Sequence, residues 1–146
     1  MVPACYLLYC PAMERRFRRD VAALEEIVDF VSAFLAAHGL DVANGFALNL
    51  IIEELFTNLV KYNVDGTQPI SVALIREGDR VVITLIDRQV SGFDITTAPA
   101  PDIDRLMDER RAGGFGIHLV RKMADEVSYR HQDGNSTIRV TRRLES

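Results

Sequence analysis

The chain has 146 residues, of which 48% are hydrophobic, 26% charged and 8% aromatic. This length suits one domain with its own core and excludes a disordered, collagen-like or disulfide-scaffold protein. The formal net charge of −4 leaves no positive surplus for a polyanionic duplex, so direct binding of nucleic acid is not expected. Cys5 and Cys10 have no histidine at zinc-site spacing, and no apolar run is long enough for a membrane helix. We therefore expect a reduced, cytoplasmic protein without a membrane partner.

The N-terminal part of the chain predicts an edge strand followed by a helix. Residues 1–13 are expected to be an irregular extension. The basic run Arg15–Arg19 suits an edge strand with solvated side chains, although it can also grip an acidic partner. From Val21, apolar residues recur at helical spacing, with Asp20 as a cap and Gly39 as a stop. This spacing predicts an amphipathic helix of about five turns.

The next segment predicts a longer helix over residues 42–62, for which Asp41 is a second cap candidate. Its apolar face is broad enough to lie between two layers. That face is built from Phe46, Leu48, Ile51, Ile52, Leu55, Phe56, Leu59 and Val60.

A hairpin and an irregular stretch follow this helix. Residues 63–69 have the composition of a turn, and β-branched runs at 70–75 and 81–86 flank Glu77-Gly78-Asp79. Residues 88–112 hold prolines and several acids but no clear strand. So long an irregular stretch in a compact domain is usually functional, often as a lid.

The C-terminal part predicts a third helix, from Ile117 to about Asp125, and a second hairpin. The hairpin joins residues 127–131 to residues 137–144 across Asp133-Gly134-Asn135. The order of elements is strand, helix, helix, hairpin, helix, hairpin. It indicates an α+β two-layer sandwich, with a mixed, mostly antiparallel sheet and helices on one face.

Two polar residues of the second helix are candidates for chemistry. Glu54 and Asn58 are four residues apart, so their side chains share one helix face. The carbonyl oxygen of Asn58 is a hard ligand suited to Mg²⁺. The ionised carboxylate of Glu54 can accept a proton from an attacking hydroxyl. The alternative is an ordinary solvated stripe, shared with Glu53 and Thr57.

Two further features suggest a nucleotide site. Asp87 ends a β-rich run, where its carboxylate can accept a hydrogen bond from an exocyclic amine or simply form a cap. Gly113-Gly114-Phe115-Gly116 stands before a helix, where small residues let the free amides approach an anion. Each feature alone is weak. Together with Glu54 and Asn58, they place three elements around a magnesium nucleotide.

These motifs also resemble a known family. Residues 52–62, IEELFTNLVKY, resemble the N box of the GHKL ATPases, residues 86–94 their first glycine box, and residues 113–120 their second. Within that superfamily the chain is most similar to the bacterial anti-sigma factor serine kinases, from Arg15 to Leu144. The resemblance implies the Bergerat, or histidine kinase-like, ATP-binding fold for residues 14–146.

The resemblance also implies roles for individual residues. Asn58 would chelate the Mg²⁺ that accompanies ATP, and Glu54 would be the catalytic base toward a partner serine. Asp87 would recognise adenine, and Gly92 would line the base pocket. The phosphate contacts would come from Gly114, Phe115, Gly116 and Ile117, whereas Arg110 and Arg111 either approach the γ-phosphate or are solvated.

One position departs from the family pattern. Gln89 stands where the first glycine box usually has its glycine, so we expect either a reshaped adenine pocket or weaker binding.

The function implied by the resemblance is an ATP-dependent anti-sigma factor serine kinase. Such a protein binds a sigma factor and phosphorylates a serine of an anti-anti-sigma (STAS-type) partner, and its family commonly forms homodimers. The alternative is a non-catalytic module that binds ATP or ADP and docks a partner protein. Glu54 favours the kinase, and Gln89 favours the module. A fragment of a two-component histidine kinase is a third, less favoured interpretation.

Overall fold

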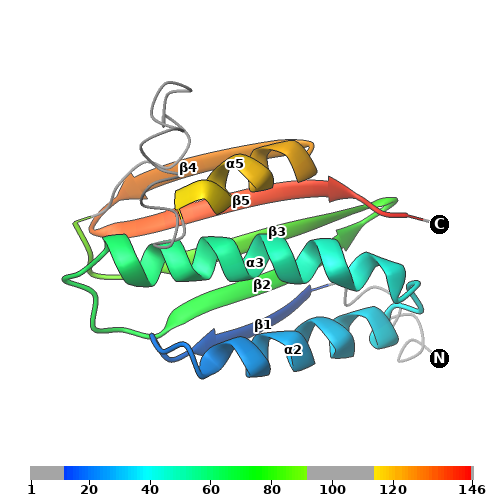
Figure 1. Ribbon diagram of the computed structural model, residues 1–146, viewed down its shortest axis with the longest axis horizontal. Helices are drawn as coiled ribbons and strands as arrows, with labels where there is room; N and C mark the ends of the chain where they lie inside the picture. Colours follow the sequence, from blue (N-terminus) through cyan, green and yellow to red (C-terminus); the bar gives the residue numbers. More distant parts are fainter. Residues whose placement is uncertain (1–11, 92–113, 146) are drawn as a thin grey trace.

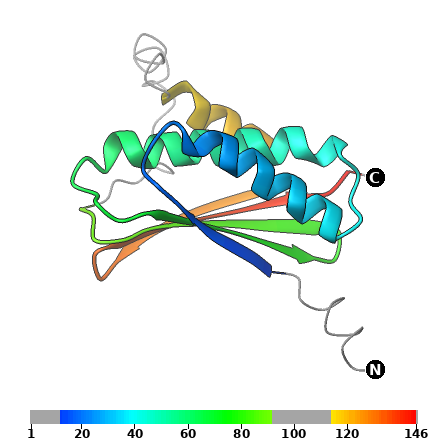
Figure 2. The same ribbon diagram turned by 90° about the horizontal axis from the view of Figure 1, so that it is seen from below.

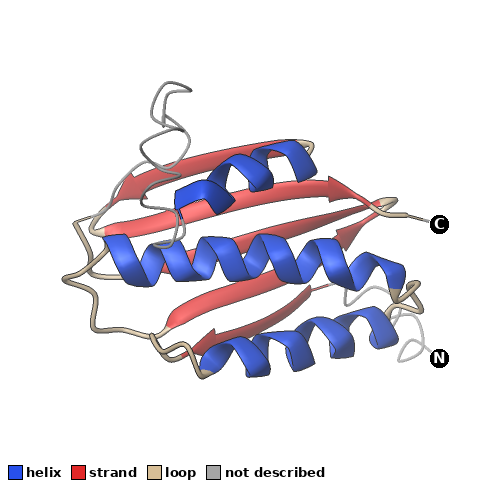
Figure 3. Cartoon of the chain, in the orientation of Figure 1, coloured by secondary structure: helices blue, strands red, loops and turns tan. Residues whose placement is uncertain are grey.

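The computed structural model describes residues 12–91 and 114–145, which contain a five-stranded sheet and three helices. The sheet order is β1-β2-β3-β5-β4, and every neighbouring pair is antiparallel (Figures 1 and 3). The strands are β1 (Ala12–Phe17), β2 (Ile70–Glu77), β3 (Arg80–Asp87), β4 (Glu126–Gln132) and β5 (Asn135–Arg143).

All three helices cover the same face of the sheet, as Figure 2 shows. They are α2 (Ala23–Ala37), α3 (Ala43–Tyr62) and α5 (Gly114–Met123). The middle helix, α3, packs against both α2 and α5. The predicted α+β two-layer sandwich is therefore confirmed. Within the described part of the chain, no helix is long and apolar enough to span a bilayer.

The core lies between the sheet and the helices. Alternate strand residues face the helices because successive side chains of a strand point to opposite faces. The core includes Phe17, Ile27, Phe34, Ile51, Leu55, Leu59, Val72, Leu74, Ile83, Leu85, Ile138 and Val140.

One expected core residue is on the surface. The prediction for Phe46 is wrong, because its side chain is 76% exposed. It lies near the start of α3 on the outward face that also carries Glu53 and the exposed Thr57, about two and three turns further on, and it lines the groove between α2 and α3.

The element boundaries follow local chemistry. A carboxylate oxygen of Asp20 accepts the amide of Ala22 at 3.0 Å, and that of Asp41 accepts the amide of Ala43 at 2.8 Å, so both acids organise the turn ahead of a helix. Gly39 ends the first helix with φ of +61°, a conformation that glycine adopts without strain. The strand β1 begins at Ala12, inside the stretch that we expect to be irregular.

The third helix begins earlier than the sequence predicts. It starts at Gly114 rather than at Ile117, so the glycines form its first turn instead of a separate turn before it. The first-turn amides of a helix have no partner within the helix, and they stay available to an anion.

Candidate active site

The Glu54 and Asn58 side chains are placed one turn apart on α3 by the helix itself. Asn58 has no exposed surface, and its Nδ2 donates to the backbone oxygen of Glu54 at 2.7 Å. The solvated-stripe interpretation is therefore wrong for Asn58, although Thr57 is exposed. Burial of a polar side chain in this position requires a partner for each polar atom.

One atom of Asn58 has no partner among the residues that the structure describes. Its Oδ1 is buried and accepts no hydrogen bond from any of them. Rotating the amide would not help, because the carbonyl of Glu54 can only accept and so requires the Nδ2 on that side. A buried acceptor without a donor costs about 1–3 kcal/mol. A hard cation would supply the missing partner, so this residue fits the magnesium ligand that the sequence predicts.

Glu54 is half-buried beside Glu53. Burial raises the pKa of the Glu54 carboxyl, and the charge of Glu53 raises the pKa further. A carboxylate with a raised pKa is a stronger base. These properties fit the catalytic base that the resemblance implies for Glu54.

Asp87, at the end of β3, is fully buried and already bonded through both of its oxygens. Oδ1 accepts Nη1 of Arg19 at 2.5 Å, and Oδ2 accepts Nδ2 of Asn63 at 2.9 Å. The sequence analysis missed both partners. Arg19 belongs to the basic run that we interpreted as solvated, which holds for Arg15, Arg16 and Arg18 but is wrong for Arg19, whose side chain is 12% exposed.

Arg19 also binds the C-terminal end of α3. Its Nη2 donates to the backbone oxygens of Leu59 at 3.2 Å and Asn63 at 3.0 Å, and its Nη1 also donates to that of Gln68 at 3.3 Å. A cation is favoured there because the last carbonyls of a helix carry partial negative charge. One guanidinium thus joins the β1–α2 connection, the end of α3 and the end of β3.

The segment after Asp87 is held from two sides. On one side, the β4–β5 turn bonds to it: Gly134 O accepts the amide of Val90 at 2.8 Å, and Asn135 Oδ1 accepts the amide of Gln89 at 3.2 Å. On the other, Oδ2 of Asp65 accepts the amide and the hydroxyl of Ser91. Chiefly because of the Ser91 hydroxyl, the pKa of Asp65 is lowered.

Gln89, which replaces the glycine of the family pattern, has an unusual backbone conformation. Gln89 has φ of +59°, in the left-handed region where a side chain costs about 1–2 kcal/mol. A backbone that takes this conformation explains why a glycine suits the position. The chain keeps this glycine-like backbone conformation with a larger, exposed residue.

The remaining predicted residues divide into a described and an undescribed group. Gly92, Arg110 and Arg111 lie outside the described residues. Gly114–Ile117 form the first turn of α5, which packs on α3. The structure thus packs α5, which begins with these glycines, on the helix that carries Glu54 and Asn58.

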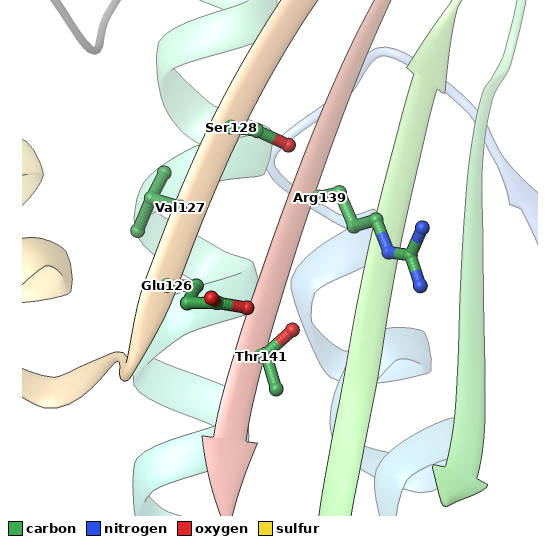
Figure 4. A pocket seen from close by; sticks show the side chains of 5 residues that line it. All are labelled: Glu126, Val127, Ser128, Arg139 and Thr141. Atoms are coloured by element: carbon green, nitrogen blue, oxygen red, sulfur yellow. The ribbon is translucent and has the colours of Figure 1, made fainter.

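A separate hollow lies on the face of the sheet without helices, as Figure 4 shows. It is lined by Glu126, Val127, Ser128, Arg139 and Thr141 and has a volume of about 560 Å³. It lies along β4 and β5, toward the end of β5 opposite the Ser136 that pairs with Asp87. It contains none of the predicted site residues.

Comparison with known proteins agrees with this arrangement. The family model of the histidine kinase-like ATPase domain matches residues 17–142. Serine/threonine-protein kinase BtrW of Bordetella bronchiseptica is 29% identical over 97 residues, which make up 66% of this chain and 68% of BtrW.

Two solved structures share the fold. One contains the RsbU and RsbW domains of Rv1364c from Mycobacterium tuberculosis, with a TM-score of 0.61, 21% identity, and coverage of 92% of this chain but only 32% of that one. The other is the SiaB–SiaC complex from Pseudomonas aeruginosa, with a TM-score of 0.60, 14% identity, and coverage of 96% and 93%. The family match runs from the last residue of β1 into β5 and includes all three helices, and the chain therefore belongs to the histidine kinase-like ATPase domain family.

Proposed function

We propose that this protein is an ATP-dependent anti-sigma factor serine kinase. It would bind a sigma factor and phosphorylate a serine of an anti-anti-sigma partner of the STAS type. The similarity to BtrW, named as a serine/threonine kinase, and the fold shared with a structure containing an RsbW domain support this assignment. The observation that carries it is the buried, unpartnered Oδ1 of Asn58, one turn from Glu54.

The nucleotide site would be built from three elements. Asn58 would hold the magnesium ion through Oδ1, while phosphate and water oxygens fill its other positions. When bound, the ion would neutralise charge on the phosphates. The first-turn amides of α5, at Gly114–Ile117, would contact the phosphates, because a helix N-terminus favours anions. Asp87 would read the base.

The proposed reaction is transfer of the γ-phosphoryl group to a serine hydroxyl. The serine oxygen forms a bond to the γ-phosphorus while the bond to the β–γ bridging oxygen breaks, and ADP leaves. Glu54 accepts the hydroxyl proton, for which its raised pKa makes it the better base. Little covalent help is needed, since phosphoryl transfer is catalysed mainly by positioning and charge neutralisation.

A phosphotransfer assay tests this proposal. Purified protein with Mg-ATP is expected to phosphorylate a serine of its cognate anti-anti-sigma protein, detected by mass spectrometry. Glu54→Ala should abolish transfer and leave nucleotide affinity largely intact. Glu53→Ala, the neighbouring half-buried acid, is the matched control and should retain transfer. Transfer by Glu54→Ala at the rate of the unmodified protein would show that this residue is not the base.

The alternative is a non-catalytic module in which nucleotide stabilises a partner-docking surface. Two observations favour it: Gln89 at the glycine position, and the engagement of Asp87 by Arg19 and Asn63. The two functions differ in one result. A module would bind nucleotide and its partner but would transfer phosphate to no serine, whatever partner is offered.

A further inference from the structure

The carboxylate of Asp87 is enclosed by two side chains with different chemistry. Arg19 contributes a cation on Oδ1, and Asn63 contributes a neutral amide on Oδ2. The Asp87 side chain has no exposed surface, so a base cannot reach it while both partners stay in place. One partner must move before Asp87 can bind anything else.

Arg19 is the partner that stays. Four of its hydrogen bonds run to Asp87 and to three backbone oxygens. If the guanidinium left, Asp87 would be a buried charge without a counter-ion, and a neutral base would not compensate it. The guanidinium is also confined, because a Cβ on Gly66 would lie only 2.3 Å from its Cζ.

Asn63 is the partner that can leave. It is only 2% exposed, and its Oδ1 is buried and accepts no hydrogen bond from the described part of the chain. The amide cannot be flipped, because Asp87 is an acceptor and requires the Nδ2. The closed arrangement therefore leaves one buried acceptor unsatisfied, a cost that disappears when Asn63 turns away.

We propose that Asn63 is an internal substitute for the base, and that Arg19 is a positioning residue for base recognition. This inference rests on the nucleotide site proposed above. The amide of Asn63 donates an N–H to Asp87 as the amine of a 6-aminopurine would. Binding exchanges one neutral N–H donor for another while Arg19 keeps Oδ1 occupied and the carboxylate charge compensated. The exchange favours a base with an amine at this position over one with a carbonyl oxygen, which would meet an acceptor with an acceptor.

The first test removes the internal donor. Titration calorimetry compares the full chain with Asn63→Ala, using ATP and inosine triphosphate, whose base has a 6-oxo group. Asn63→Ala should bind ATP about fivefold more tightly, the equivalent of one neutral hydrogen bond, and should bind inosine triphosphate with an affinity changed by less than about twofold. Asn49→Ala is the matched control, since Asn49 lies on the same helix with an unpartnered buried Oδ1 but lines the remote α2–α3 groove.

The second test displaces the guanidinium without removing its charge. Gly66 does not have a positive φ, so alanine suits its backbone, and the added Cβ must push the end of the flexible Arg19 side chain aside. Gly66→Ala should weaken ATP binding about tenfold and reduce the preference for ATP over inosine triphosphate. Gly45→Ala, a substitution of a glycine within α3, should leave this preference unchanged.

The two variants should thus move the ATP preference in opposite directions, which general structural damage would not do. A lower or unchanged preference in Asn63→Ala would overturn the inference and leave the nucleotide site standing, and so would an unchanged preference in Gly66→Ala. If the unmodified protein bound neither nucleotide at millimolar concentration, the proposed function would fail together with this inference.

Discussion

Replacing Arg19 with methionine is expected to destabilise the fold strongly. Methionine keeps an unbranched side chain of similar reach but removes the donors to Asp87, Leu59, Asn63 and Gln68. Removing one partner of a buried ion pair costs about 3–5 kcal/mol, because the other charge stays buried without compensation. The burial of Asp87, with no exposed side-chain surface, places this pair in that class rather than among surface pairs.

The free energy of unfolding can be measured by guanidinium chloride denaturation followed by circular dichroism. For a domain of this size, a destabilisation of about 1 kcal/mol lowers Tm by about 2–4 °C. In a thermal melt we therefore expect the Tm of Arg19→Met to fall by a value on the order of 10 °C. The adjacent Arg18→Met is the control. Arg18 is exposed, and its replacement should change stability by less than about 0.5 kcal/mol.

A double-mutant cycle with Asp87→Asn separates the ion pair from the other bonds of Arg19. The two substitutions should couple by about 0.5–3 kcal/mol, as directly contacting residues do. A destabilisation by Arg19→Met below about 1 kcal/mol, with coupling near zero, would refute the reasoning, since a screened surface pair contributes about that little.

Four further results are expected. Phosphoryl transfer should fall as the pH drops through the pKa of Glu54, which burial and the charge of Glu53 raise above its ordinary value. A rate profile that follows a carboxyl with an ordinary pKa would contradict this. Because a raised pKa means that the Glu54 charge opposes folding above it, Glu54→Gln should also stabilise the fold at neutral pH in a thermal melt. Gln89→Gly should raise the free energy of unfolding by about 1 kcal/mol by removing left-handed strain, and Gln89→Ala, which keeps the strain, should not. Ser91→Ala should raise the pKa of Asp65 toward its ordinary value in an NMR titration, because the hydroxyl is the main cause of its lowering; this anchor is present at neutral pH and lost as the pH falls through the lowered pKa.

Local sequence patterns were sufficient to predict the layers of the fold. The helical spacing from Val21 and the β-branched runs around Gly78 each correspond to an observed element, because the period of apolar residues reflects which face is buried. The exposed Phe46 shows the limit of this reasoning: its apolar character predicts a place on the buried face, whereas its helical position places it with Glu53 and Thr57 on the outward face. The early start of α5 was also missed, because glycines were interpreted as a turn before the helix. Glycine destabilises a helix little in its first turn, where the amides lack helical partners.

The contacts at the site were less predictable because they join distant parts of the chain. Arg19 and Asp87 are 68 residues apart, and nothing in the basic run distinguishes Arg19 from Arg18. Asn63 is a residue type common in turns, and only the packing of the end of α3 near the end of β3 brings it to Asp87. The burial of Asn58 likewise depends on what packs over α3. The chain pattern indicates which residues carry the chemistry, and the tertiary packing decides which atoms are already occupied.

The order of strands has a consequence for how the protein is made. The strand β5 comes from residues 135–143, yet it lies inside the sheet, between β3 and β4. On the ribosome, a nascent chain that has not yet reached this strand has nothing to pair with the exposed edges of β3 and β4. Such unpaired edges promote aggregation of incomplete chains. Premature termination within residues 135–143 should therefore be far more damaging than a substitution at the same positions.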